Sequence, residues 1–259
     1  MRIPSPEAFA KRTVASVQEY SLLTWHAVSA IFSQPRYIDD TFTQMDFVGF
    51  GSIPIVILTG FFTGCVLTLQ SATSLKQFGA VNMTGRLVAL SMVKELGPVL
   101  TGLMVSGRNA SGMASELGSM KVTEQIDAMR ALGTDPVRKL VAPRLLATVI
   151  MMFFLTIIAD ACGIAGGALV AVGLLGLEGG AFFHTAFRSL VFGDVIEGLA
   201  KPLFSGFIIA TIGCYYGLRT TGGTQGVGRS TTQAVVSSSV LIILFDFFVT
   251  KMMIGIFGR

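Results

Sequence analysis

Charged residues are scarce in this sequence. Only 13% of its 259 residues are Asp, Glu, Lys or Arg, whereas 52% are hydrophobic. A soluble domain of this length carries roughly 25% charged residues, so the composition excludes an ordinary soluble protein and indicates a polytopic membrane protein. In such a protein the net charge of +4 indicates loop charges that set orientation and gives no signal for nucleic-acid binding.

Histidine and cysteine are also rare, which limits the chemistry that the chain can perform. The two histidines, His26 and His184, are far apart, and the three cysteines lie in apolar segments at positions 65, 162 and 214. We therefore expect no disulfide, no metal site and no cofactor bound by this chain. A hydrolase inside the membrane is disfavoured, because neither histidine falls in a predicted span. The first apolar tract is too interrupted to predict a cleavable signal peptide.

Most of the chain after residue 52 consists of long apolar runs. A helix that crosses a membrane needs about 17–25 such residues. Five spans are expected, at about 53–70, 85–107, 145–175, 195–218 and 234–257. Residues 53–259 are therefore predicted to form one all-α domain with five transmembrane helices. The segment between the third and fourth spans, with Phe182, Phe183 and His184, is expected to be a loop.

Residues 1–52 have a different pattern, in which apolar and charged side chains alternate. The segment 8–32 combines Trp25 with Lys11 and Glu19, which is typical of a helix that lies in the membrane interface. A second short helix is expected over 37–47. We therefore predict N-terminal interfacial amphipathic helices ahead of the spans.

Small residues recur every four positions in two of the spans. This spacing lets the backbones of two membrane helices approach closely. The positions are Gly60 and Gly64 in the first span and Ala159, Gly163, Gly167 and Ala171 in the third.

The distribution of basic residues predicts the orientation. With the N-terminus inside, eleven lysines and arginines fall in cytoplasmic segments, and only Lys76, Arg188 and Arg259 fall in outer segments. The excess of positive charge on one side favours a cytoplasmic N-terminus and an outer C-terminus.

Several ionisable side chains lie inside the predicted spans, where an unpaired charge is costly. They are Lys94, Glu95, Asp160, Lys201 and Asp246. A rise of about 1.5 Å per residue places them in one layer, and we expect Lys201 to pair with Asp246 or Asp160. Two interpretations stay open for these charges: they only fasten helices together, or they take part in function.

The stretch 94–144 changes from an apolar helix to a polar, basic segment. Within it, residues 122–133 are expected to form a short amphipathic helix, with Thr123 as N-cap and Gly133 as the C-terminal stop. Val122, Ile126 and Met129 form its apolar stripe. A surface helix of this kind can pass force from a soluble motor to a membrane span, although an ordinary cytoplasmic loop helix has the same pattern.

The same stretch resembles the permease subunit of the MlaE/YrbE family of ABC lipid transporters. The matching residues are Glu95-Leu96-Gly97-Pro98, Gly107-Arg108, Glu116-Leu117-Gly118, Met120, Thr123-Glu124-Gln125-Ile126-Asp127-Ala128, Gly133, Pro136 and Pro143-Arg144. Two positions depart from the family pattern. Lys94 stands where arginine is more usual, and Asn109 stands where a small or apolar residue is expected.

The resemblance implies a homodimeric permease of the bacterial inner membrane that moves phospholipid between the inner and outer membranes. Related permeases handle sterols or other lipids. Partner proteins implied are cytoplasmic ABC ATPases, which use the ATP, a small STAS-domain protein and an outer MCE-domain protein. The ATPases are expected to bind a coupling helix through Glu124, Gln125, Ile126, Asp127, Met129, Arg130 and Leu132. A lipid pocket is expected at Leu67, Leu75, Phe78, Lys94 and Glu95, although the three apolar residues are also suited to core packing or to facing lipid.

Residues 223–230, GTQGVGRS, imitate the spacing of a phosphate-binding loop. A true phosphate loop follows a buried strand, whereas this segment follows a predicted membrane helix. We expect a Gly-rich cytoplasmic turn there and no nucleotide site, so ATP hydrolysis must come from a partner. An ion-coupled transporter is disfavoured because no inverted repeat is visible, and a membrane scaffold without transport activity stays an alternative.

Overall fold

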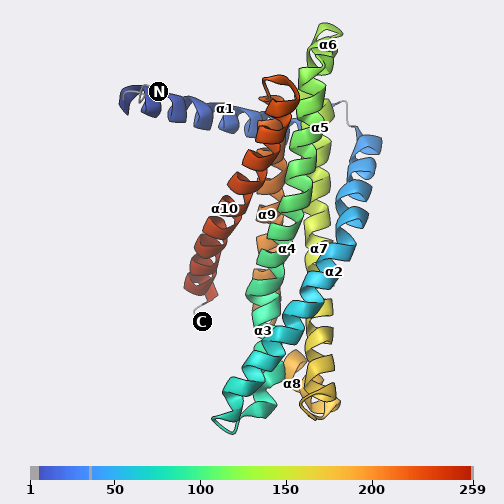
Figure 1. Ribbon diagram of the computed structural model, residues 1–259, viewed down its shortest axis with the longest axis vertical. Coiled ribbons are helices and arrows are strands. Elements are labelled where there is room, and N and C mark those ends of the chain that lie inside the picture. The colour runs from blue at the N-terminus through green and yellow to red at the C-terminus, as the bar shows by residue number, and fades with distance from the viewer. Residues whose placement is uncertain (1–5, 35–36, 258–259) are drawn as a thin grey trace.

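The computed structural model describes residues 6–34 and 37–257, and these residues form helices and connecting turns only (Figure 1). The α-helices are α1 (Pro6–Phe32), α2 (Ile38–Lys76), α3 (Thr84–Ser91), α4 (Gly97–Val105), α5 (Ser111–Val122), α6 (Gln125–Ala131), α7 (Ala142–Gly173), α8 (Gly179–Ser189), α9 (Phe192–Leu218) and α10 (Gly223–Phe257). Four short helical segments connect them: the 3-10 turn η1 (Val81–Met83) and the π-helical turns η2 (Met92–Leu96), η3 (Ser106–Ala110) and η4 (Val137–Val141).

Five helical stretches are long and apolar enough to cross a membrane. They cover 38–76, 81–122, 137–173, 192–218 and 223–255. The all-α membrane fold with five spans is therefore confirmed. The second span is continuous through α3, η2, α4, η3 and α5, so its helix extends beyond the expected end of the span at residue 107.

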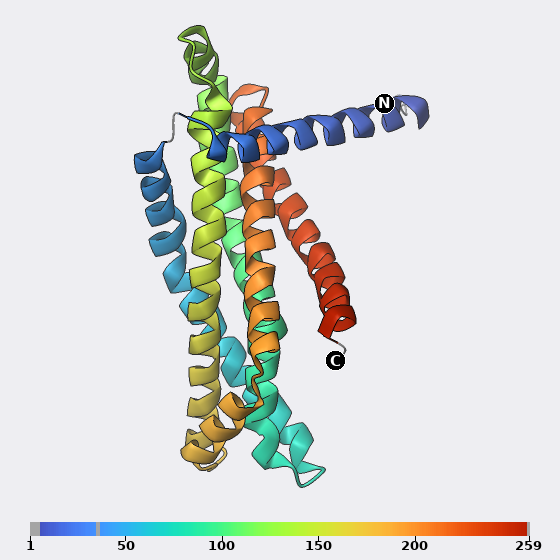
Figure 2. The ribbon, with the colours of Figure 1, turned by 180° about the vertical axis from the view of Figure 1, so that it is seen from behind.

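Helix α1 lies across one end of the bundle, transverse to the spans (Figures 1 and 2). Its apolar side chains Val14, Leu22 and Trp25 are exposed, at 66%, 60% and 75%. Exposed apolar side chains on a helix that lies across the bundle end suit the membrane interface. The separate helix expected over 37–47 is wrong, because those residues form the first turns of α2. This helix continues through Pro54, which membrane helices tolerate.

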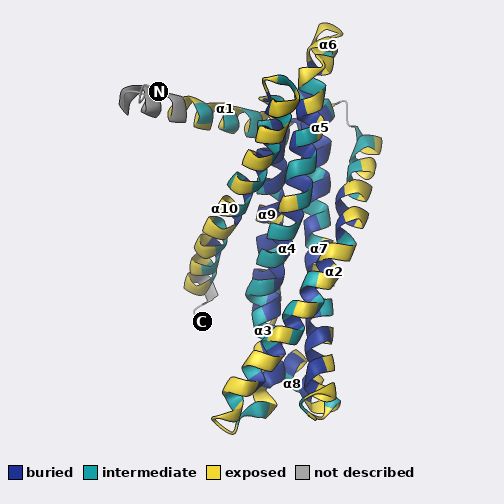
Figure 3. Ribbon diagram, viewed as in Figure 1, coloured by how far each residue is buried: buried dark blue, intermediate teal, exposed yellow. Residues whose placement is uncertain are grey.

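Helices α2 and α7 pack closely through the predicted small residues. A Cβ atom on Gly64 would lie 1.8 Å from the carbonyl oxygen of Gly163, and one on Gly60 would lie 2.7 Å from that of Ala159. Only glycine allows the two backbones this approach. Figure 3 shows the result: α7 and α9 are largely buried, whereas α2 and α10 present exposed outer faces.

The motif residues fasten the second span to its neighbours. Arg144 is 4% exposed, and its guanidinium lies 2.8 Å from the Glu116 carboxylate and so joins α7 to α5. Arg108 donates to the carbonyl of Phe47 at 3.0 Å, and Asn109 donates to the hydroxyl of Ser52 at 3.3 Å. These bonds join the second span to α2, and they give the unusual Asn109 a buried acceptor.

Two connections differ from expectation. The segment with Phe182, Phe183 and His184 is helix α8, whose Phe182 is 3% exposed and packs in a core cluster with Val88 of α3. The GTQGVGRS segment forms the start of helix α10, where a Gly-rich connecting turn was expected. The chain reverses just before this segment, at Gly222. The described residues contain no strand, so the strand that a phosphate loop follows is not found there.

Candidate functional site

The second span contains a break in its regular hydrogen bonding at Lys94 and Glu95. Here the turn η2 is π-helical, and the N–H of Gly97 donates to the carbonyl of Met92, five residues back. Pro98 follows and has no N–H, so the carbonyl of Lys94 loses its usual partner four residues on. That carbonyl instead accepts a hydrogen bond from the Lys201 ammonium, at 2.8 Å. The irregularity beside Pro98 is therefore a widened turn with a side-chain donor from another helix.

Helix α9 presents three charged side chains to this break. Asp194, Glu197 and Lys201 are three and four residues apart, so they share one face of the helix. All three residues are buried, with exposures of 8%, 5% and 3%. Burial of this kind requires partners for each charge.

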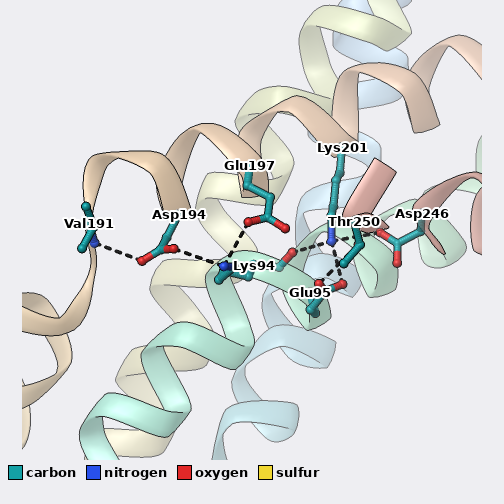
Figure 4. Close-up of polar contacts among 8 residues, drawn as sticks. All are labelled: Lys94, Glu95, Val191, Asp194, Glu197, Lys201, Asp246 and Thr250. Atoms are coloured by element: carbon teal, nitrogen blue, oxygen red, sulfur yellow. Dashed lines mark hydrogen bonds and ion pairs between the residues drawn. The ribbon is translucent and has the colours of Figure 1, made fainter. Parts of the chain in front are cut away.

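The charges pair in two groups along the membrane (Figure 4). The Lys94 ammonium lies 3.1 Å from the Asp194 carboxylate and 3.0 Å from that of Glu197. Lys201 lies 2.6 Å from the Glu95 carboxylate and 3.3 Å from that of Asp246 on α10. These pairs join the second span, α9 and α10 at one level, which we call the charged layer: Lys94, Glu95, Asp194, Glu197, Lys201 and Asp246.

The structure thus pairs Lys201 with Asp246, one of the two partners expected, and not with Asp160. Asp160 of α7 is 8% exposed, and its Oδ1 has no hydrogen-bond partner among the described residues. It lies against the backbone of Gly97, where a Cβ atom would come within 1.7 Å of Oδ1. Asp160 therefore contacts the helix break at Gly97, but it takes no part in the ion pairs of the charged layer.

A cavity of about 220 Å³ adjoins Lys94 between α9 and α10. Lys94, Asp194 and Glu197 form its polar wall. Its apolar wall is made by Val191, Phe192, Ile196, Met253 and Ile254. An apolar chamber with a few polar groups at one side is the general form of a site for an amphipathic ligand.

The apolar residues predicted for the lipid pocket do not line this cavity. Leu67 packs against the core cluster that contains Val88 and Met92, Leu75 is half-buried, and Phe78 is 80% exposed at the end of α2. Leu67 therefore fits the alternative of core packing. Lys94 already contacts two carboxylates, so a lipid phosphate would have to displace them.

A second candidate region is the tip of the molecule at α6, which extends beyond the bundle at the end where α1 lies (Figure 1). The expected N-cap, Thr123, instead ends α5, and its hydroxyl donates to the carbonyl of Ser119 at 2.9 Å. Glu124 forms the corner in the left-handed region, with φ of 60°. Gly133, with φ of 79°, follows the helix as expected.

Two residues of the expected apolar stripe, Ile126 and Met129, pack against the protein itself, whereas Val122 is exposed. Ile126 is fully buried in a core cluster with Leu117 and Leu140, and Met129 packs against the same cluster. Ile126 therefore positions α6 and offers no docking surface, which corrects the expectation for that residue, whereas Met129 is half-buried and its contact with the ATPase stays a prediction. The exposed residues of the predicted set are Glu124, Gln125, Asp127, Arg130 and Leu132, the last at 83%.

Asp127 organises the charges at the tip. Its carboxylate lies 2.7 Å from the Lys121 ammonium and 3.1 Å from the Arg130 guanidinium. The hydrogen bond from Lys121, with the charge of Arg130, lowers the pKa of Asp127 below its ordinary value. The tip therefore carries a fixed negative charge between two positive ones.

Asp194, Glu197 and Thr250 are site residues that the sequence reasoning missed. Asp194 lies just before the expected start of the fourth span, and Glu197 lies inside it. The spacing of these two with Lys201 on one helical face was the available signal. Thr250, whose hydroxyl lies 3.4 Å from the Glu95 carboxylate, gave none. No group of three or more His, Cys, Asp or Glu in the described residues is arranged to hold a metal ion.

Known proteins are similar to this chain over most of its length. The family described as Permease MlaE matches residues 41–252. A probable ABC transporter permease protein of Rickettsia typhi is 44% identical over 92% of both chains. Another from Synechocystis is 41% identical over 83% of this chain and 81% of its own. The intermembrane phospholipid transport system permease protein MlaE of Haemophilus influenzae is 38% identical over 82% of both.

Proposed function

Because this chain belongs to the MlaE permease family, we propose that it is the membrane-spanning subunit of an ABC transporter that moves phospholipid between two membranes. The observation that carries the proposal is the similarity over 82% of both chains to a permease named for intermembrane phospholipid transport. The five spans, the charged layer with its amphipathic cavity and the projecting tip all suit this role.

ATP hydrolysis in this proposal belongs to separate ATPase subunits that bind the tip. The exposed set Glu124, Gln125, Asp127, Arg130 and Leu132 supports this, because it combines polar groups with one large apolar side chain. Leu132 can enter a pocket on the partner while the surrounding charges set the orientation. Ile126 holds α6 against the bundle, so that a push on the tip moves the second span.

The second span can pass that movement into the membrane because it is continuous from 81 to 122. Its two π-helical turns, η2 and η3, are the places where an α-helix most readily changes its winding. One of them carries Lys94 and Glu95. A displacement of α6 would therefore alter the pairing within the charged layer and the cavity beside it.

The transported lipid would enter a larger pocket between two copies of the chain, with an MCE-domain protein on the opposite end from α6 and a STAS-domain protein on the ATPases. The exposed apolar face of α10, with Leu244, Phe247 and Phe248, supports a partner or lipid contact on that side. The bacterial inner membrane is the proposed location. Basic residues gather at the end that carries α6, which supports a cytoplasmic N-terminus and an outer C-terminus.

The test compares two exposed apolar residues at opposite ends of the molecule. Leu132→Asp changes the tip, and Phe78→Asp changes a side chain of similar exposure, 83% against 80%, near the other end. Each tagged variant is purified in mild detergent, and the co-purified proteins and lipids are identified by mass spectrometry. We expect Leu132→Asp alone to lose the ATPase, with phospholipid retained in both.

The opposite pattern, with the ATPase lost only in Phe78→Asp, would reverse the orientation. Co-purification of a sterol without phospholipid would indicate that the substrate is a sterol and not a phospholipid. Normal lipid transfer by a complex that contains Glu95→Gln would show that the charged layer only holds the helices together. Absence of lipid transfer by the unmodified complex would favour the alternative of a membrane scaffold without transport activity.

A further inference from the structure

A cavity of about 440 Å³ lies where α1, α9 and α10 meet, close to the end of the bundle that carries α6. It shares no lining residue with the cavity at Lys94. Its volume falls within the range of sites for small molecules, about 300–1,000 Å³.

The cavity is polar at one end and apolar at the other. Arg219 and Gln233 line it near the turn between α9 and α10, whereas Ile212 and Leu241 line it farther from that turn. At about 1.5 Å per residue, the apolar residues lie about 10–12 Å along their helices from the polar ones. Because α1 marks the membrane interface, the polar end lies at headgroup depth and the apolar end points toward the hydrocarbon. A lipid in the adjacent leaflet has the same direction of polarity.

Three tyrosines form a fixed wall. The hydroxyl of Tyr20 pairs with that of Thr211 at 2.8 Å, Tyr215 donates to the carbonyl of Ser16 at 3.2 Å, and Tyr216 pairs with Ser237 at 2.9 Å. The rings of Tyr20 and Tyr215 meet edge to face at 5.6 Å between centroids. Aromatic rings held in this way present surface to a ligand at little cost in conformational entropy.

The charges beside the cavity come as a pair of opposite sign. The Arg219 guanidinium lies 5.3 Å from the centroid of the Tyr215 ring and 3.1 Å from the Glu19 carboxylate. Within the described part of the chain, its contacts to Glu19 and to the Tyr215 hydroxyl both use Nη1. The N–H groups on Nη2 and Nε can therefore donate to a further anionic oxygen. Glu19 is half exposed and can accept from a cation at the same time.

We propose that this cavity binds an amine-bearing phospholipid of the leaflet next to α1. The phosphate accepts from Arg219, the ammonium contacts the half-exposed Glu19 carboxylate, and the start of an acyl chain contacts Leu241 and Ile212. The positive Arg219 and the negative Glu19 thus lie against the negative phosphate and the positive ammonium of the zwitterionic headgroup. The site is distinct from the transport function proposed above, because binding there requires neither the ATPase nor movement of lipid.

The experiment uses the full chain, without partners, in phosphatidylglycerol vesicles. A small fraction of phosphatidylethanolamine carries a photoreactive diazirine near the start of one acyl chain, and labelled peptides are identified by mass spectrometry. We expect label on the cavity segments of α9 and α10, around Ile212 and Leu241, and unlabelled phosphatidylethanolamine should displace it. Arg219→Gln should lower the labelling about tenfold, as expected for a lost charge-assisted hydrogen bond.

Two further variants make the result specific. Leu241→Trp fills the apolar end without changing any charge, and it should also remove the label. Arg229→Gln removes an exposed arginine of α10 at the same end but outside the cavity lining, and it should label normally. Equal labelling in all variants would overturn the site.

Two competition experiments identify the ligand. Displacement of the label by millimolar inorganic phosphate would overturn the lipid assignment and indicate a soluble anion. A photoreactive phosphatidylglycerol in phosphatidylcholine vesicles that labels the cavity as strongly as the phosphatidylethanolamine probe would overturn the contact between Glu19 and an amine.

Discussion

Replacement of Lys201 by methionine tests whether the charged layer stabilises the membrane fold. The Lys201 ammonium contacts the carbonyl of Lys94 and the carboxylates of Glu95 and Asp246, and the residue is 3% exposed. Methionine has a similar length and keeps the apolar stem. The variant therefore removes the charge and leaves two carboxylates beside each other without a cation.

The expected loss of stability in Lys201→Met follows from the burial of its two carboxylate partners. Removing one member of a buried ion pair costs about 3–5 kcal/mol. The Glu95 side chain is 41% exposed and that of Asp246 is 19% exposed, so solvent relieves part of the loss and we expect about 3 kcal/mol. At about 2–4 °C per kcal/mol for a chain of this size, the midpoint of thermal unfolding should fall by about 6–12 °C.

The free cysteines provide the assay. Cys214 is fully buried in the bundle, so a dye that fluoresces on reaction with thiols reports unfolding in detergent. Lys251→Met is the matched control, because it removes a lysine from an exposed position on α10 and should leave the midpoint unchanged.

Neutralising the stranded carboxylates should rescue the variant. Lys201→Met combined with Glu95→Gln and Asp246→Asn has no buried charge at this point, and neutral groups of similar volume replace buried ion pairs at little net cost. We expect the triple variant to recover at least half of the lost stability. A single variant as stable as the parent, or a triple variant no more stable than the single, would refute the proposed electrostatic role.

Two further predictions concern packing and the tip. Gly64→Ala should destabilise the protein by about 3 kcal/mol, because the new Cβ would lie 1.8 Å from the Gly163 carbonyl oxygen, whereas Gly107→Ala, with no atom within 4 Å, should cost nothing in the same thermal assay. Equal midpoints for the two variants would contradict close packing of α2 on α7. The Asp127 carboxyl should titrate below its ordinary pKa of 3.8, so its ion pairs are complete above that pH and are lost as the pH falls through the lowered value. Carbon-detected NMR with Lys121→Met as the comparison checks this, and a midpoint at or above 3.8 in the unmodified chain would be incompatible with it.

The spans and their close packing were predictable because each depends on a pattern within one segment. Apolar length predicts a span, and the spacing of Gly60 and Gly64 predicts the face that meets another backbone. Boundaries were less accurate where two helices merge. Residues 37–47 are polar enough to predict a separate surface helix, yet they continue into α2, which runs on through Gly49, Gly51 and Pro54 without ending.

The partners inside the charged layer were only partly predictable, because pairing depends on how three helices rotate about their axes. The depth estimated from sequence position placed Lys201 and Asp246 at one level, but it placed Asp160 at the same level and so could not distinguish between the two carboxylates. Rotation separates them, since Asp160 faces Gly97 while Lys201 faces Glu95. The sequence shows an apolar stripe with Ile126, but it does not say whether the same chain or a partner covers that stripe, and the structure buries Ile126 within the chain.

The helix break explains how a lysine can be buried at this depth. An ammonium has three donors and no acceptor, and each donor needs a partner where water is excluded. The break supplies two of them from adjacent residues: Pro98 frees the carbonyl of Lys94, and the widened turn holds Glu95 beside it. The Asp246 carboxylate of α10 lies 3.3 Å from the ammonium and adds an ion pair. The proline that weakens the second span is therefore also the reason that α9 can bind it, and the charged layer lies at the level where the span loses a backbone hydrogen bond.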